Sequence, residues 1–162
     1  MRSPSAKGPR IEPDDHAAFL IVSIANRVSS SASQAYTRCF GVGVMEWRVI
    51  GMLAGRPGAA AKDIAQFSGL DKSAVSRAVQ ALVQVGHVAT EPDPEDSRRI
   101  RLRLTPSGKA LHDRIIVASL AREELLLDGF TAEDRAAFFG FLRRVAGNTA
   151  LVEAHDPGAS QT

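Results

Sequence analysis

Residues 97–108, which read SRRIRLRLTPSG, combine a strongly cationic pattern with an apolar one. Four arginines lie in the first seven positions, and three of them alternate with the apolar residues Ile100, Leu102 and Leu104. Side chains point alternately to the two faces of a strand. The pattern therefore predicts a strand whose apolar face packs on helices and whose opposite face carries Arg99, Arg101 and Arg103. Such a cationic face is either merely solvated or contacts a polyanion. The neighbouring segments of the sequence are needed to decide between these two alternatives.

The charge is unevenly distributed along the chain. The net charge is only +2, so the overall balance says nothing about a nucleic-acid partner. Residues 98–109 nevertheless contain five basic residues and no acidic one, whereas residues 91–96 contain four acids. Residues 92–98, PDPEDSR, hold two prolines and cannot continue a helix. The flanking segments 87–91 and 99–105 alternate at period two, which predicts a hairpin with a long charged tip.

Two short helices are predicted immediately before this hairpin. The first, AAKDIAQFSGL, has Ile64 and Phe67 as inward residues and ends at Gly69. The second begins after Asp71, an N-cap residue, and has Gly86 at its C-terminal capping position. Its inward stripe is predicted to comprise Val75, Val79, Leu82 and Val83. A helix, a short glycine-containing turn and a second helix are the outline of a helix-turn-helix.

Longer helices are predicted on both sides of this core. After Asp14 or Asp15 as cap, apolar residues recur at helical spacing for about seven turns; they are Ile21, Ile24, Val28, Ala32, Ala35 and Cys39. A helix of that length suggests packing against a large surface, such as a second chain. Another helix is predicted with Thr105 as its cap, Pro106 as its first residue and a stripe at Leu111, Ile115, Ala118 and Leu125. Thr131 and Asp134 form the capping pattern of the last helix. A further helix, VMEWRVIGMLAG, is predicted between the first long helix and the two short ones, with Trp47, Ile50 and Leu53 on one side. The predicted order is therefore α-α-α-α-β-β-α-α.

Several ordered features resemble the multiple antibiotic resistance regulator (MarR) family. They are Ser76–Arg77, the spacing from Leu82 to Gly86, the Asp96 and Arg98 pair, and the ending Leu104-Thr105 with Gly108. The resemblance spans roughly residues 14–150. It departs at Ser97, which separates the aspartate from the two arginines, and at residues 89–91, ATE, where many members carry an arginine.

The resemblance implies a mainly α (α+β) fold with a winged helix-turn-helix core. In that arrangement residues 13–154 form one domain, with the winged helix at about 44–105. The dimerisation helices are at about 13–40 and 106–154, and two chains form an intimate homodimer. Residues 1–12 and 155–162, rich in small and polar residues, are expected to be loose tails.

The DNA-binding residues implied by this arrangement lie on the second short helix and on the wing. Its exposed donors can reach base edges or phosphates; they are Lys72, Ser73, Ser76, Arg77 and Gln80. A wing tip with Arg98 can enter the minor groove, supported by Arg99 and Arg101. By resemblance, Asp96 forms an ion pair that orients the wing arginine. The structural alternatives are a turn residue at Asp96 and ordinary surface charge at Arg77.

The resemblance also implies a small aromatic effector that releases a repressor from a pseudo-palindromic operator. Its cleft would involve Phe19, Ser23, Trp47 and His112, although Phe19 and Trp47 are more often core residues. Cys39 is the only cysteine and has no resolving partner. A buried small apolar role is therefore favoured over a redox-responsive regulator of the same fold.

Other function classes have less support in the sequence. No phosphate loop, Gly-x-Ser-x-Gly elbow or His-Glu-x-x-His motif is present, so an enzyme is not expected. No metal site or cofactor is expected either, because the four histidines lack ligand spacing. The chain has no apolar run long enough to span a bilayer and no apolar stretch after its basic start, so a cytoplasmic protein without a membrane partner is expected. A winged helix that contacts only proteins remains the alternative of a different class.

Overall fold

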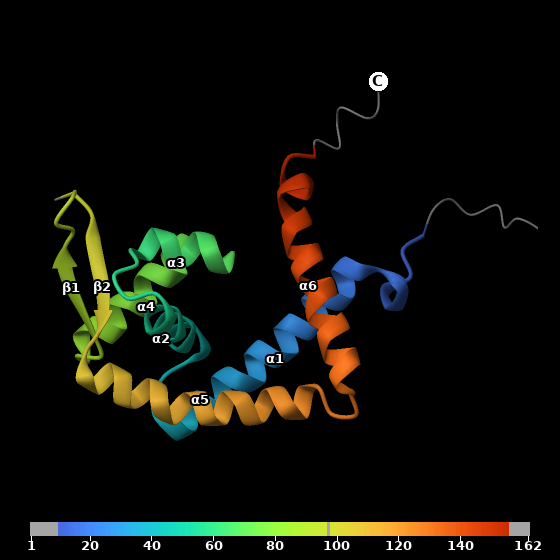
Figure 1. The fold of residues 1–162 in the computed structure, drawn as a ribbon, viewed down its shortest axis with the longest axis horizontal. Helices are drawn as coiled ribbons and strands as arrows, with labels where there is room; N and C mark the ends of the chain where they lie inside the picture. The colour runs from blue at the N-terminus through green and yellow to red at the C-terminus, as the bar shows by residue number, and fades with distance from the viewer. Residues whose placement is uncertain (1–9, 97, 156–162) are drawn as a thin grey trace, which may run out of the picture. The chain divides into compact units, whose positions relative to one another are not determined.

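The computed structural model describes residues 10–96 and 98–155. The elements follow one another as η1 (Pro13–Asp15), α1 (Ala17–Phe40), α2 (Val44–Gly55), α3 (Ala61–Ser68), α4 (Lys72–Gln84), β1 (Val88–Pro92), β2 (Ile100–Leu104), α5 (Pro106–Leu126) and α6 (Ala132–Glu153) (Figure 1). The predicted order of helices and strands is confirmed, with the short η1 added. Ser97 and most of the two predicted tails lie outside the described residues. The chain divides into two compact units, one up to Val117 and one from Ala118.

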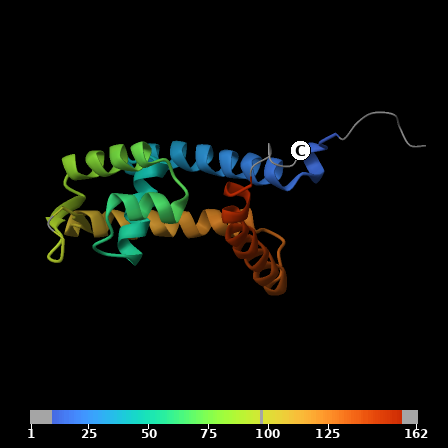
Figure 2. The same ribbon diagram turned by 90° about the horizontal axis from the view of Figure 1, so that it is seen from above.

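Helix α2 is the centre of the first unit, because it packs against α1, α4 and β2. The side chains that fill this core are fully buried aliphatic residues: Val49, Ile50, Leu53, Ile64, Val75 and Leu82. Helix α4 in turn packs against α3 and β1. Figures 1 and 2 both place the β1–β2 hairpin at one end of this unit, next to α4. Burial of these helix faces therefore fixes α3, α4 and the hairpin relative to one another.

The ends of the helices follow their local sequence, with one exception. Gly41 and Gly69 have φ of 74° and 60°, so both adopt the left-handed conformation that ends α1 and α3, and the end predicted at Gly69 is confirmed. The predicted cap of α1 at Asp14 or Asp15 is wrong. These residues belong to the 3-10 turn η1, and His16 is the N-cap without a side-chain hydrogen bond.

The hairpin is antiparallel and is joined on its other side by the loop between α2 and α3. Thr90 pairs with Leu102 in the register of the two strands. The N–H of Gly58 donates to the carbonyl of Leu102 at 2.9 Å, and the N–H of Leu102 donates to the carbonyl of Ala59 at 3.2 Å. Leu102 is buried as predicted, but Ile100 is 47% exposed, so its predicted packing on the helices is wrong. It lies at the distal end of β2, beyond the reach of the core.

A close backbone contact joins the hairpin to α5. Thr105 caps α5 as predicted, because its hydroxyl oxygen accepts from the N–H of Gly108 at 3.1 Å. The same hydroxyl donates to the carbonyl of Gly86 at 2.7 Å. A Cβ on Gly108 would lie 2.0 Å from the carbonyl oxygen of His87. Only glycine therefore permits this approach.

The second unit is held by a helix cap and a bidentate ion pair. Thr131 and Asp134 form the predicted capping box at the start of α6. The carboxylate of Glu124 accepts from both terminal nitrogens of Arg135, at 2.9 and 2.7 Å. This pair, together with the buried side chain of Leu127, joins the end of α5 to the start of α6.

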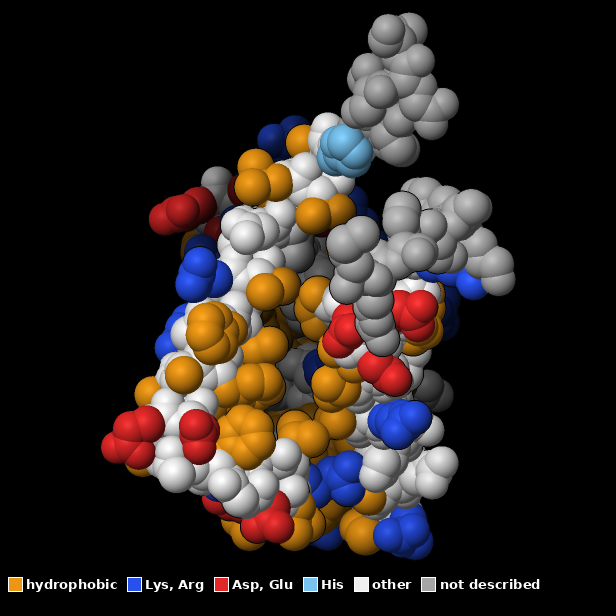
Figure 3. All heavy atoms as spheres, turned by 90° about the vertical axis from the view of Figure 1, so that its right-hand side faces the viewer, with side chains coloured by type: hydrophobic (Ala, Val, Ile, Leu, Met, Phe, Trp, Pro, Cys, Tyr) orange, Lys and Arg blue, Asp and Glu red, His pale blue; other side chains and the backbone are white. Residues whose placement is uncertain are grey.

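Much of the apolar surface of the long helices remains exposed within one chain. In α1, Ala32 of the predicted stripe is buried, whereas Ile21, Ile24 and Val28 are exposed. Exposed apolar residues of the other long helices include Leu120, Leu125, Phe141, Leu142 and Val145. Figure 3 shows numerous hydrophobic side chains open on one face of the molecule. The predicted burial is wrong for Phe67 of α3 and Val83 of α4.

Replacing Gly108 with Ala is expected to destabilise the protein by about 3 kcal/mol or more, since the new methyl group would overlap backbone that cannot move aside. Gly51→Ala is the matched control. Its added Cβ meets nothing within 4 Å, and alanine favours a helix interior by about 1 kcal/mol. Urea unfolding of both variants checks this. Equal stabilities would contradict the steric role of Gly108.

Candidate DNA interface

Helix α4 presents all five predicted donors at its surface. Asp71 caps the helix, because its carboxylate accepts from the N–H of Ala74 at 2.9 Å. The burial of Val75, Ala78, Val79 and Leu82 fixes which face is turned inward. The exposed residues of the helix include every predicted donor: Lys72, Ser73, Ser76, Arg77 and Gln80. No acidic residue occurs within α4 itself, so the face contains donors and one carboxylate at its start.

A chain of hydrogen bonds orients Arg77 across the first turns of α4. Its Nη1 donates to the hydroxyl of Ser73 at 3.0 Å, and that hydroxyl donates to the Asp71 carboxylate. The hydrogen bond from Ser73, followed by that from the N–H of Ala74, lowers the pKa of Asp71. Arg77 is thus held near the positive end of the helix, where an anion is favoured.

The predicted wing pair exists at the surface of the hairpin tip. Arg98 Nε lies 3.3 Å from Asp96 Oδ1, and the Arg98 side chain is 91% exposed. Asp96 also accepts from the backbone N–H of Arg98 at 3.0 Å. Both side chains are open to solvent, so this pair is a weak constraint on the position of the wing.

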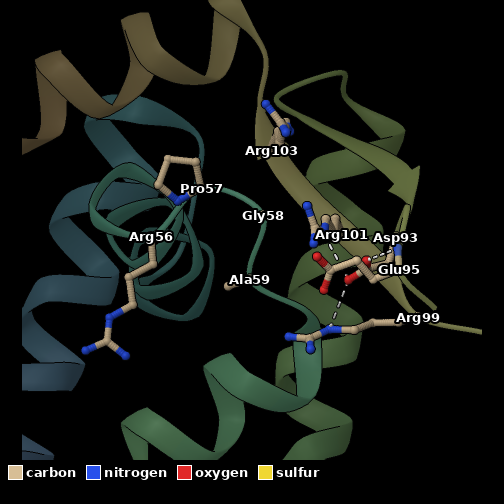
Figure 4. A pocket seen from close by; sticks show the side chains of 9 residues that line it. All are labelled: Arg56, Pro57, Gly58, Ala59, Asp93, Glu95, Arg99, Arg101 and Arg103. Atoms are coloured by element: carbon tan, nitrogen blue, oxygen red, sulfur yellow. Dashed lines mark hydrogen bonds and ion pairs between the residues drawn. The ribbon is translucent and has the colours of Figure 1, made fainter.

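A second acid of the hairpin, Asp93, is more buried than Asp96 and lies beside two other arginines of the wing. Its side chain is only 5% exposed and lies 2.9 Å from Arg101 Nε and 3.6 Å from Arg99 Nε. Arg99 Nη2 also lies 2.5 Å from Oδ2 of Asp63, near the start of α3. Figure 4 shows Arg99 and Arg101 gathered around Asp93. The hairpin is thereby connected to α3 through charged side chains.

The pKa directions agree with this arrangement. The hydrogen bond from Arg101, then that from the N–H of Glu95, holds the pKa of Asp93 below its usual value. The same contact with Asp93 raises the pKa of Arg101. The N–H of Ala60 is the main cause of the lowered pKa of Asp63, and Arg99 adds to it. Both carboxylates are therefore stabilised in their charged forms.

Asp93 and Asp63 were missed because each has a local explanation in the sequence. Asp93 precedes Pro94 and accepts from the N–H of Glu95 at 2.9 Å, as expected of a turn residue. Asp63 lies in the first turn of α3, where its carboxylate accepts from the N–H of Ala60 at 3.0 Å. The sequence did contain a signal for such pairing: acids in 91–96 and arginines in 99–103 lie on opposite sides of the predicted hairpin. It is also seen in Glu91, whose carboxylate lies 3.0 Å from Arg103 Nε.

A shallow pocket of about 400 Å³ lies between the loop after α2 and the hairpin. Its lining includes Arg56 from the loop and Arg99, Arg101 and Arg103 from the hairpin. Arg56 points away from the Asp93 group (Figure 4). Its guanidinium lies 3.9 Å from the ring centroid of Phe67, which explains how that exposed ring is partly covered.

The predicted effector residues do not all meet within one chain. The Trp47 ring stacks on His112 with centroids 5.6 Å apart and contacts Tyr36 edge-on at 6.1 Å. Phe19 instead makes an edge contact with His16 at 5.4 Å. At 1.5 Å per residue, Phe19 and Ser23 lie about 25 and 20 Å along α1 from Tyr36. The buried Tyr36 is a neighbour of Trp47 that the sequence analysis did not single out.

Cys39 is exposed, so its predicted role as a buried apolar residue is wrong. It lies one residue before the end of α1. Among residues 10–96 and 98–155, no group of three or more potential ligands is arranged to hold a metal ion. Within the same part of the chain, no helix is both long and apolar enough to cross a membrane.

Comparisons with known proteins agree with this geometry. The MarR family model matches residues 40–99. A MarR/EmrR family transcriptional regulator from Acinetobacter sp. ADP1 is 31% identical, with a TM-score of 0.81 over 87% of this chain and 99% of that one. The PcaV transcriptional regulator from Streptomyces coelicolor, solved in complex with its natural ligand, is 26% identical, with a TM-score of 0.71 over 87% of this chain and 99% of PcaV.

A curated relative matches over a shorter region. The HTH-type transcriptional repressor NicR from Pseudomonas putida is 29% identical over 83 residues, which are 51% of this chain and 52% of NicR. The match therefore spans about half the length of that relative. The family model, the nearly complete coverage of the Acinetobacter regulator and the winged helix formed by α2–α4 with the β1–β2 hairpin lead to one conclusion: this chain belongs to the MarR family of transcriptional regulators.

Proposed function

We propose that this protein is a homodimeric, sequence-specific DNA-binding repressor that acts in the cytoplasm. The observation that carries the proposal is the exposed face of α4, where five donors lie together and Arg77 is oriented by Ser73. A helix with donors near its N-terminus can read base edges in the major groove. The exposed Arg98 at the hairpin tip suits the negative potential of a narrow minor groove.

The exposed apolar faces of α1 and α6 support a homodimer. Phe141, Leu142 and Val145 are exposed in one chain, as are Ile21 and Ile24. Several exposed apolar residues along one helix indicate an interface, whereas scattered single ones do not. A two-fold dimer presents two copies of α4, which suits a pseudo-palindromic operator with half-sites about 10 base pairs apart.

Repression and release by an effector are supported by relatives and by one aromatic cluster. NicR is a repressor by name, and PcaV was solved with its natural ligand. In this chain Tyr36, Trp47 and His112 form a ring cluster between α1, α2 and α5. We assign a small aromatic acid to this cluster.

DNA binding tests the function directly. The purified protein is titrated onto the DNA upstream of its own gene and onto a scrambled duplex, across a series of salt concentrations. A repressor of its own region binds the first more tightly, with an affinity that falls steeply as salt rises. Equal weak binding to every duplex in a selection from random sequences would favour a winged helix used for protein contacts.

Arg77→Ala is expected to weaken operator binding by about 1 to 3 kcal/mol and to relax specificity at one base pair. The physical reason is the loss of a guanidinium that can donate to two acceptors of guanine. Gln84→Ala, an exposed change at the other end of α4, is the control and should bind normally. Fluorescence anisotropy with the operator measures both. Normal binding by Arg77→Ala would contradict the assignment of α4 as the reading helix.

Benzoate is expected to change the fluorescence of Trp47, which is the only tryptophan of the chain, and to weaken operator binding. His112→Ala removes the ring that stacks on Trp47 and should weaken benzoate binding at least several-fold. Its operator affinity without benzoate should be unchanged. Fluorescence titration checks the first point and anisotropy the second. A signal that persists unchanged in His112→Ala would place the ligand elsewhere.

A further inference from the structure

Two arginines of the wing, Arg99 and Arg101, are much less exposed to solvent than Arg98. Asp93 and Asp63 are two carboxylates, and Arg99 and Arg101 are two guanidiniums, so the group they form is neutral. Arg101 is 29% exposed and Arg99 38%, compared with 91% for Arg98. Among the described residues of the wing, Arg98 is therefore the arginine most accessible to a ligand.

We propose that Asp93 and Asp63 are positioning residues that keep Arg99 and Arg101 from DNA phosphates and thereby set the ratio of specific to nonspecific DNA binding. The inference rests on the proposed DNA-binding function. In this proposal Arg99 and Arg101 pair with Asp93 and Asp63 instead of contacting DNA. We call these ion pairs between the hairpin and α3 the latch. Arg98 is then the wing residue that contacts DNA.

Asp93 competes effectively with phosphate because of its burial. An oxygen of its carboxylate lies 2.9 Å from Arg101 Nε, and 95% of its side chain is shielded from solvent. Water screens such a pair less than one at the surface. If Arg101 moved to a phosphate, the Asp93 carboxylate would remain buried without its main cation, which is costly. Arg101 is therefore retained within the chain.

Arg99 adds a connection between two elements. It lies between Asp93 in the hairpin and Asp63 at the start of α3, with its Nη2 on the Asp63 carboxylate. The backbone hydrogen bonds of Leu102 with Gly58 and Ala59 hold β2 beside the loop between α2 and α3. The hairpin tip and Arg98 are consequently held relative to α4, which packs on α3. A fixed wing favours an operator whose grooves match it over arbitrary DNA.

The consequence appears in the dependence of affinity on salt. Each phosphate that a protein neutralises makes the slope of log affinity against log salt steeper by about 0.9. If the carboxylates withhold two arginines, the removal of one carboxylate should add up to two phosphate contacts. These contacts carry no sequence information, so nonspecific binding should gain more than operator binding.

The test compares Asp93→Asn and Asp63→Asn with Glu95→Gln, which has the same change of charge in the same hairpin but no ion pair with Arg99 or Arg101. Each protein is titrated by anisotropy onto the operator and onto a scrambled duplex between 50 and 200 mM salt, a range in which about 10³- to 10⁵-fold effects are typical. Asp93→Glu, which keeps a carboxylate, tests rescue. Hydrogen exchange of residues 99–103 without DNA reports the latch independently of function.

Asp93→Asn should bind scrambled DNA about tenfold more tightly, with a slope steeper by about 1 to 2. Asp63→Asn should steepen the slope by at most about 0.9, because Asp63 pairs only with Arg99, which Asp93 also faces. Glu95→Gln and Asp93→Glu should remain close to the wild type. Exchange of residues 99–103 should be faster in both asparagine variants than in Glu95→Gln.

The proposal is overturned if Asp93→Asn has the slope and specificity ratio of Glu95→Gln. Should Asp93→Asn fail to fold, an unchanged slope in Asp63→Asn has the same meaning. If the wild type shows no preference for any DNA sequence, the proposed sequence-specific DNA-binding function is wrong. Faster exchange in the asparagine variants would then still establish the latch, and unchanged exchange would refute it.

Discussion

A buried carboxylate must have cations beside it, and in this protein that constraint organises the wing. The side chain of Asp93 is almost fully shielded, so its charge requires Arg101 and Arg99. Through Arg99 the same requirement reaches Asp63 and the start of α3. These ion pairs connect the hairpin, which carries Arg98 at its tip, to the start of α3. The apolar contacts of Leu102 and its backbone bonds to the neighbouring loop act in the same direction.

The helix-turn-helix and the long helices satisfy different requirements. In the first unit, α2 and α4 each bury an aliphatic face within one chain, which fixes the direction in which the opposite, exposed face of α4 points. The long helices do the opposite, because apolar residues of α1 and α6 remain exposed. In the proposed homodimer a second copy would cover these residues, and the spacing of the two α4 helices would depend on that assembly.

Two contacts show how small groups connect these parts. Gly108 allows α5 to begin against the backbone of His87, which ties the end of the hairpin to the long helix that leaves the first unit. The stacking of Trp47 on His112 joins α2 to the same helix one turn later. A ligand that separated these rings would act on the helix that follows the wing directly. The contact with the hairpin, at Gly108, and the aromatic cluster, at His112, thus lie one turn apart on α5.

The amino-acid sequence by itself determined the order of elements, the helix-turn-helix, the hairpin and the caps at Asp71, Thr105 and Thr131, because periodicity and capping are local. It also identified the exposed donors of α4, since the inward stripe of a helix defines its outward face. Only the tertiary structure decided which acid is buried in the wing, because Asp93, Glu95 and Asp96 look alike until the hairpin folds against α3. The same holds for Ile100, Phe67 and Cys39, whose exposure depends on where neighbouring elements end rather than on the residues beside them in the chain.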